Sequence, residues 1–128
     1  MANGTTSWKE YVDFRLDIVA SRDSGMKYKE LAKKYSRCVG YLQLLYRQGK
    51  WIEEEFKRDD SLDKIVYEKC GHLPNAQLTT LHNYLYRGGI KPVTVSALRE
   101  ITIEEASSIY GIGVKHLAIL KEIKEAIK

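Results

Sequence analysis

The residues best suited to chemistry in this chain are cations, and they gather in one stretch. Residues 22–51 hold eight Lys and Arg against two acids, whereas the 128-residue chain as a whole has 21 Lys and Arg against 17 acids. Clustered positive charge is the electrostatic footprint of a nucleic-acid-binding surface, because the nucleic-acid backbone is a chain of negative phosphates. The alternative is a solvated helix face, the usual surrounding of surface lysines. The charge pattern favours phosphate binding in the first half of the chain.

Three segments with apolar residues at helical spacing must position these cations. The first predicted helix begins at Ser7, which forms a capping box with Glu10, and runs to about Ala20. The second runs over residues 28–34 and the third over residues 39–48, where Gly49 is expected to end it. The cations therefore lie on and around two short consecutive helices.

Residues 27–51 resemble the helix-turn-helix of many bacterial and phage DNA-binding proteins. The resemblance lies in the run Glu30-Leu31-Ala32-Lys33-Lys34-Tyr35, followed by a turn and then by Leu42 and Leu45. The sequence departs from that pattern at three positions: Ser36 replaces the turn glycine, Arg37 replaces an apolar residue, and Gly40 lies inside the recognition helix. The resemblance implies that the third helix enters the major groove of DNA.

The same resemblance implies two kinds of DNA contact. Candidates for base contacts are Arg37, Tyr41 and Gln43, since Arg suits guanine and Gln suits adenine. Candidates for phosphate contacts, which set salt dependence rather than sequence choice, are Lys27, Lys33, Lys34, Arg47 and Lys50. Core packing is the alternative for the aromatic residues of this segment, and we expect it for Tyr35 and Trp51.

The second half of the chain predicts two helices on either side of Gly111-Ile112-Gly113. Thr102 and Glu105 have the spacing of a capping box for the first of these helices. Backbone N–H groups at the start of the second helix could bind a phosphate, with Lys115 and His116 adding charge or a hydrogen bond. The alternative is an ordinary helical hairpin whose Gly111 and Gly113 serve only the turn.

Residues 78–127 resemble the C-terminal domain of the bacterial RNA polymerase α subunit. The matching residues are Arg87-Gly88-Gly89-Ile90, Val93-Thr94-Val95, Leu98, Ile103-Glu104-Glu105, Gly111-Ile112-Gly113, Leu117, Ile119-Leu120 and Ile123, with a two-residue insertion around Lys91-Pro92. The resemblance implies a compact helical domain with a helix-hairpin-helix that binds the DNA minor groove and touches transcription factors. Thr80 and Gly111 stand near the positions of the family's DNA-contacting arginine and asparagine, and Lys115 matches its lysine, so the resemblance supports the fold more than DNA binding.

The sequence gives little support for catalysis, metal binding or membrane insertion. It contains no P-loop, GxSxG or HExxH motif, and Cys70, His72 and His82 lack a second pair of ligands at metal-binding spacing. No run approaches the about 18–20 apolar residues of a membrane span, and the start of the chain lacks the apolar core of a signal peptide. We therefore expect a cytoplasmic protein that is not an enzyme and carries no cofactor or metal.

These patterns together predict an all-α protein of two small units. A helix-turn-helix unit is expected over residues 7–52, an acidic connecting helix and linker over 53–75, and the α-subunit-like domain over 76–128. The leading hypothesis is a small DNA-binding protein, a bacterial or phage transcriptional regulator whose partner is double-stranded DNA. The alternatives are a module that binds RNA polymerase or another transcription protein without reading DNA, and a phage packaging or replication accessory protein. The oligomeric state is left open.

Overall fold

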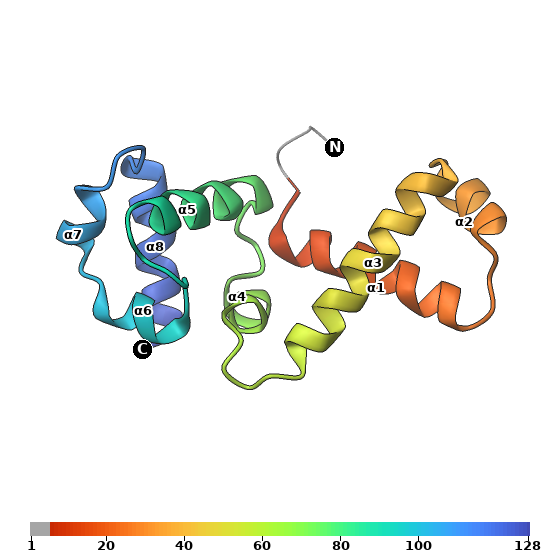
Figure 1. The fold of residues 1–128 in the computed structure, drawn as a ribbon, viewed down its shortest axis with the longest axis horizontal. Coiled ribbons are helices and arrows are strands. Elements are labelled where there is room, and N and C mark those ends of the chain that lie inside the picture. The colour runs from red at the N-terminus through yellow and green to blue at the C-terminus, as the bar shows by residue number, and fades with distance from the viewer. Residues whose placement is uncertain (1–5) are drawn as a thin grey trace. The chain divides into compact units, whose positions relative to one another are not determined.

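The computed structural model of the chain describes residues 6–128. The regular secondary structure of these residues is entirely helical, which confirms the predicted all-α class (Figure 1). The helices are α1 (Trp8–Asp23), α2 (Tyr28–Tyr35), α3 (Val39–Phe56), α4 (Leu62–Cys70), α5 (Asn75–Arg87), α6 (Val95–Glu100), α7 (Ile103–Ser107) and α8 (Val114–Ala126). None of them is long and apolar enough to cross a membrane. Residues 1–5 lie outside the described residues, and the predicted lack of a signal peptide rests partly on them.

The chain divides into two units whose boundaries differ from the predicted ones. The 10–59 unit is Glu10–Asp59, and the 60–128 unit is Asp60–Lys128 together with the described residues before Glu10. The predicted connector over residues 53–75 is therefore divided between the two units. Its first residues form the end of α3, and Val66 and Cys70 of α4 are part of the core of the 60–128 unit. Residues 53–75 are acidic overall, but the unit to which α4 belongs is determined by the burial of its apolar side chains.

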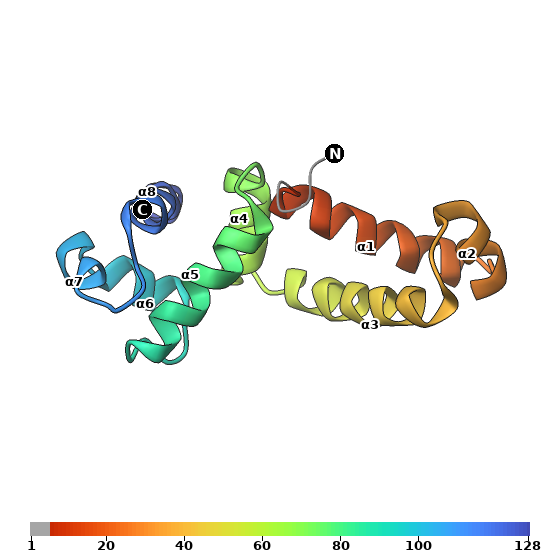
Figure 2. The ribbon, with the colours of Figure 1, turned by 90° about the horizontal axis from the view of Figure 1, so that it is seen from above.

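In the 10–59 unit, α1 and α3 lie side by side and α2 packs against α3 at one end of the pair (Figures 1 and 2). The core at that end consists of Ile18, Leu31, Leu42 and Leu45, all fully buried. The turn between α2 and α3 passes through Ser36, whose φ of 53° is in the left-handed region and takes the place of the usual glycine.

Gly49 does not end α3, as predicted, but lies in its interior where α3 crosses α1. A Cβ at this position would collide with the Val19 side chain and would stand 2.7 Å from the Arg15 carbonyl oxygen. The helix continues seven residues beyond Gly49 to Phe56, and α1 likewise continues past the predicted end near Ala20 to Asp23. Packing of α1 against α3 thus overrides the low helix propensity of glycine.

A buried arginine stands at the same crossing. Arg15 is only 9% exposed, and its guanidinium lies 3.4 Å from the centre of the Tyr11 ring. Its Nε donates a hydrogen bond to Gln48 Oε1 (2.8 Å) and its Nη1 donates to the Tyr11 carbonyl (3.2 Å). Burial lowers the pKa of the guanidinium from its ordinary value. The charge is tolerated there because hydrogen bonds and an aromatic face replace its lost water.

In the 60–128 unit, residues 6–9 are hydrogen-bonded to the segment that connects α4 and α5. The Trp8 amide donates to the Leu73 carbonyl (2.8 Å), and the Lys9 amide donates to that of Gly71 (2.9 Å). The Asn75 amide donates in return to the Thr6 carbonyl (2.9 Å). Residues 7–9, which the sequence pattern assigned to the first unit, therefore belong to the 60–128 unit.

Local signals in the 60–128 unit were read correctly from the sequence. The capping box of α7 is present, with the Glu105 amide donating to Thr102 Oγ1 (3.0 Å) and the Thr102 amide donating to Glu105 Oε1 (3.2 Å). α6 and α8 also cap each other: Lys124 Nζ donates to the carbonyls of Leu98 and Ile101 (both 2.6 Å), and Arg99 Nε donates to that of Ile127 (2.6 Å). Lys124 of α8 thus bonds carbonyls at the C-terminal end of α6, and Arg99 of α6 bonds a carbonyl at the C-terminal end of α8.

The contact at Gly49 generates a prediction about stability. Gly49→Ala should destabilise the 10–59 unit by about 2 kcal/mol, because the added methyl forces α1 and α3 apart and outweighs the better helix propensity of alanine. The measurement is urea unfolding followed by the amide signals of that unit. Gly40→Ala in the same helix is the matched control: nothing lies within 4 Å of its Cβ, so stability should rise by up to about 1 kcal/mol. Equal effects of the two substitutions would contradict the proposed crossing.

Candidate nucleic-acid interface

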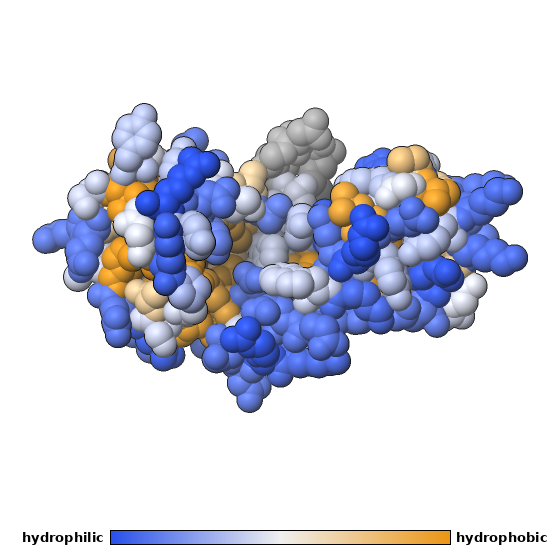
Figure 3. Space-filling view, viewed as in Figure 1, coloured by the Kyte–Doolittle hydropathy of each residue, from blue (hydrophilic) through white to orange (hydrophobic). Residues whose placement is uncertain are grey.

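The surface of α2 and the first half of α3 carries cations that no acid neutralises. The side chains of Lys27, Lys33, Lys34, Arg37 and Arg47 are all exposed, and none of them makes an ion pair within residues 6–128. Figure 3 shows the hydrophilic side chains that project at the α2 end of the unit, with apolar residues reaching the surface beside them. Unpaired exposed cations keep their charge available for an external anion.

The cations in the second half of α3 behave differently. Lys50 Nζ lies 2.8 Å from Asp23 Oδ2 and 3.5 Å from Glu53 Oε1, and the Tyr46 hydroxyl donates to Asp23 Oδ1 (2.7 Å). The hydrogen bonds from Lys50 and Tyr46 lower the pKa of Asp23, and the bond to Asp23 raises the pKa of Lys50. The structure therefore places the predicted phosphate contact Lys50 in an internal ion pair.

Two further cations follow the end of α3 and are paired in the same way. Lys57 lies 2.9 Å from Glu54, and Arg58 lies 3.7 Å from Glu55. The boundary between free and neutralised cations therefore falls between Arg47 and Lys50, and the candidate surface is confined to α2 and the first half of α3.

One face of α3 points away from the core and carries the predicted base contact Gln43 and the predicted phosphate contact Arg47. Because Leu42, Leu45 and Ile52 are buried, the residues on the opposite side of the helix are exposed. These residues are Gly40, Gln43, Leu44, Arg47 and Trp51. Tyr41, 39% exposed, stands at the edge of this face, and Arg37 precedes the helix.

The structure corrects one expectation on this face and adds residues to it. Trp51, expected in the core, is 57% exposed, whereas Tyr35 packs as expected with its ring edge-on to Phe14. Lys29 and Leu44 are exposed beside the predicted contacts and were not selected. The helical period could have found Leu44, since the spacing that turns Leu42 and Leu45 inward turns Leu44 outward.

The two predicted hairpin glycines, Gly111 and Gly113, differ in their surroundings. Gly111 has φ +95°, and a Cβ there would collide with the Tyr84 ring, so both the turn and the ring require glycine. Gly113 precedes the first turn of α8 in extended backbone, with open space around it. Tyr110 and Val114 beside the loop are 95% and 86% exposed. The tip of this hairpin is therefore an apolar projection.

The structure does not place Lys115 and His116 together as phosphate contacts. Lys115 is exposed, whereas the His116 ring packs edge-on against Tyr84, with centroids 5.6 Å apart. His116 Nε2 is buried and has no hydrogen-bond partner in the described structure. The imidazole thus belongs to the packing beneath the hairpin, and Lys115 is an exposed cation in the first turn of α8.

The histidines and cysteines considered as metal ligands have other neighbours. His72 Nε2 lies 2.7 Å from Glu122 Oε2, and the Cys70 thiol contacts the Glu122 carbonyl at 4.0 Å. Burial raises the pKa of that thiol. Across residues 6–128, no three side chains of His, Cys, Asp or Glu gather closely enough to hold a metal ion.

The arrangement of charge around α2 and α3 is suited to holding an extended anion. Several unpaired cations spread over two helices can each meet a different negative group, which a single small anion cannot provide. Comparisons of this chain with protein-family models, curated proteins and solved structures give no match. Evidence about function therefore comes from the chain's own residues.

Proposed function

We propose that the 10–59 unit binds duplex DNA through α2 and α3 and that the protein acts as a bacterial or phage transcriptional regulator. The observation that carries this proposal is the contrast along one helix pair. Every candidate cation from Lys27 to Arg47 is exposed and unpaired, and those from Lys50 to Arg58 are paired with acids. An evenly solvated charged surface would show no such division.

The unpaired cations provide the affinity of the proposed complex. Each Lys or Arg that meets a phosphate releases condensed counterions, so binding should weaken linearly on a log–log plot against salt. Lys27, Lys33 and Lys34 on and before α2 suit this role, because their long flexible side chains meet phosphates as point charges. They would fix the unit on the duplex without selecting a sequence.

The exposed face of α3 provides the proposed base contacts. Arg37 can bind guanine through two hydrogen bonds, and Gln43 can do the same with adenine. Arg47, a candidate for a phosphate contact, lies on the same outward face. Leu44 offers an apolar contact for the methyl group of thymine. Gly40 has no packing role in the fold, and its missing side chain would let the backbone of α3 approach the duplex closely.

A second candidate function is favoured by the α7–α8 hairpin. Tyr110 and Val114 project from its tip almost fully exposed, and Lys115 is a cation in the first turn of α8 beside them. An apolar tip with little charge suits a protein surface better than a phosphate backbone. The 60–128 unit would then bind RNA polymerase or another transcription protein, alone or in addition to DNA binding by α2 and α3.

The first prediction of this proposal concerns the two arginines. Replacing Arg37 and Arg47 together with Ala should weaken duplex binding about 30-fold or more and lower the salt slope, since each such contact contributes about 1–3 kcal/mol. The measurement is fluorescence anisotropy with a labelled duplex over a series of salt concentrations.

Lys57→Ala with Arg58→Ala is the matched control, because it removes the same charge from the same unit. Its effect should stay below about threefold, since Glu54 and Glu55 already neutralise these cations. Equal losses in the two double variants would show that net charge, rather than the α2–α3 surface, governs binding.

The second prediction concerns Gly40. Gly40→Leu should leave the 10–59 unit folded, because nothing lies within 4 Å of its Cβ, and should weaken duplex binding about tenfold by holding α3 away from the groove. The same anisotropy titration measures this, with the amide spectrum as the check on folding. Unchanged affinity for the duplex would show that the N-terminal part of α3 does not contact DNA.

The third prediction separates the two candidate functions. If the hairpin binds a protein, purified bacterial RNA polymerase should be retained by the immobilised chain at moderate salt without DNA. Tyr110→Ala with Val114→Ala should abolish retention, because it removes the exposed apolar tip. The Arg37 and Arg47 double variant should retain the polymerase. Retention that requires duplex in every variant would contradict the second candidate.

A further inference from the structure

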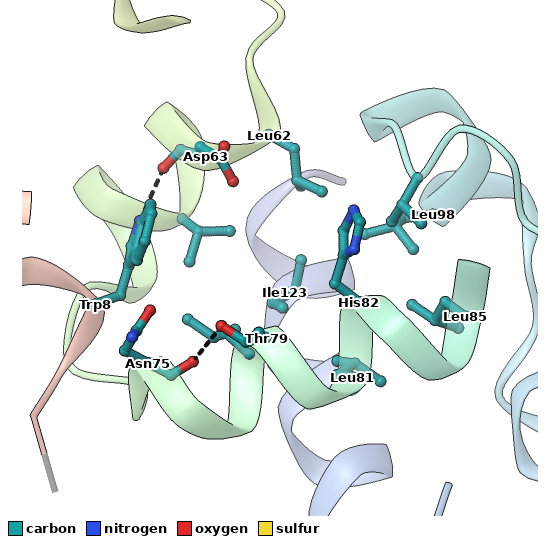
Figure 4. Close-up of a pocket in the computed structure, with 13 residues that line it drawn as sticks. Trp8, Leu62, Asp63, Asn75, Thr79, Leu81, His82, Leu85, Leu98 and Ile123 are labelled. Carbon is teal, nitrogen blue, oxygen red and sulfur yellow. Dashed lines mark hydrogen bonds between the residues drawn. The ribbon is translucent and has the colours of Figure 1, made fainter. Parts of the chain in front are cut away.

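The 60–128 unit contains a cavity that the proposed DNA-binding surface does not use. It has a volume of about 250 Å³ and lies among α4, α5 and α8 (Figure 4). Its walls are mainly apolar, with Leu62 and Val66 from α4, Leu81 and Leu85 from α5, and Ile123 from α8. An apolar cavity of about 150 Å³ is enough to bind benzene, so this one has room for a two-ring molecule.

Two flat rings stand on opposite sides of the cavity in Figure 4: the indole of Trp8 and the imidazole of His82. The indole is fixed in place, because its Nε1 donates to the Asp63 carbonyl (3.0 Å) while the Trp8 amide donates to that of Leu73 (2.8 Å). With its N–H already bonded, the indole contributes ring surface to the wall of the cavity. Aromatic side chains favour a flat aromatic guest in such a position.

Polar side chains line the cavity from two helices: Asp63 lies on α4, and the others lie along one side of α5. Asn75, Thr79 and His82 all line it, and their spacing of four and three residues places them on one face of the helix. The Thr79 hydroxyl donates to the Asn75 carbonyl (3.0 Å) and is therefore occupied. The Asn75 side-chain amide and the His82 imidazole have no hydrogen-bond partner in the described part of the chain. They are available to one polar group of an occupant.

The surroundings of the cavity favour a small molecule over the side of a partner helix. A docked helix needs an apolar surface that extends beyond its anchoring pocket. The large apolar residues that are exposed in the described part of this unit are Tyr86, Tyr110 and Val114, and none of them lines the cavity. Polar groups of α4 and α5 stand beside its apolar walls, so the structure favours an occupant that fits inside the cavity.

We propose that this cavity is a binding site for a small, flat aromatic molecule that carries one hydrogen-bonding group. The rings of Trp8 and His82 would flank the guest, while Val66 and Ile123 contact its apolar edges. Its polar group would bond to His82 or Asn75. This site goes beyond the proposed DNA binding and does not depend on it.

The test is a titration of the isotope-labelled full chain with indole and with indene, followed by amide chemical shifts. Indole should give saturable shifts confined to residues around the cavity, and it should bind about tenfold more tightly than indene, which has the same shape but no N–H. In His82→Phe, which keeps the flat ring, indene should bind as before and the preference for indole should shrink. Equal binding of the two probes to the native chain would overturn the polar part of the proposal.

A blocking variant tests whether the cavity itself is the site. Thr79→Trp places an indole at its edge from an exposed position, so indole binding should fall about tenfold or more. Asn83→Trp is the matched control, because Asn83 is exposed on the same helix but does not line the cavity, and binding should be kept. Undiminished binding in Thr79→Trp, or no saturable shifts in the native chain at millimolar indole, would overturn the proposal and leave a partner's side chain as the occupant.

Discussion

The contact between α1 and α3 at Gly49 is the constraint on which the 10–59 unit depends. With no Cβ at that position, the α3 backbone packs directly against Val19 and the backbone of Arg15. The contact fixes the rotation of α3 about its own axis, so Leu42, Leu45 and Ile52 point inward. Every residue of the proposed base-contacting face is outward as a consequence. A shift of this helix by one residue would rotate it by about 100° and turn part of that face toward α1.

The sequence predicted those parts of the fold that local interactions determine. Thr102 and Glu105 form the predicted capping box because the two partners are only three residues apart. The end of α3 was predicted wrongly because glycine is a poor helix former in isolation. The packing that keeps Gly49 helical comes from α1, more than 25 residues away, and no local pattern records it.

The candidate site could be predicted as a set of residue types but not as a set of available groups. The ion pair of Lys50 with Asp23 joins residues 27 positions apart, and it separates Lys50 from cations that look identical to it in the sequence. His116 is likewise not available as a DNA contact, because its ring packs against Tyr84 of another helix. Trp51 shows the opposite error, since a large aromatic residue was expected to be buried. Exposure and ion pairing depend on tertiary contacts, which is why these three assignments needed the fold.

The two proposed sites use different physical forces, and this makes them separable. Contacts between exposed cations and phosphates are screened by salt over a distance of about 8 Å at physiological ionic strength. Binding in an apolar cavity buries non-polar surface, which salts such as sulfate strengthen rather than weaken. Rising ionic strength should therefore remove an anion from α2 and α3 while leaving an aromatic guest between Trp8 and His82. An occupant of the cavity held mainly by charge would respond the other way, so the salt dependence of each site reports the force that forms it.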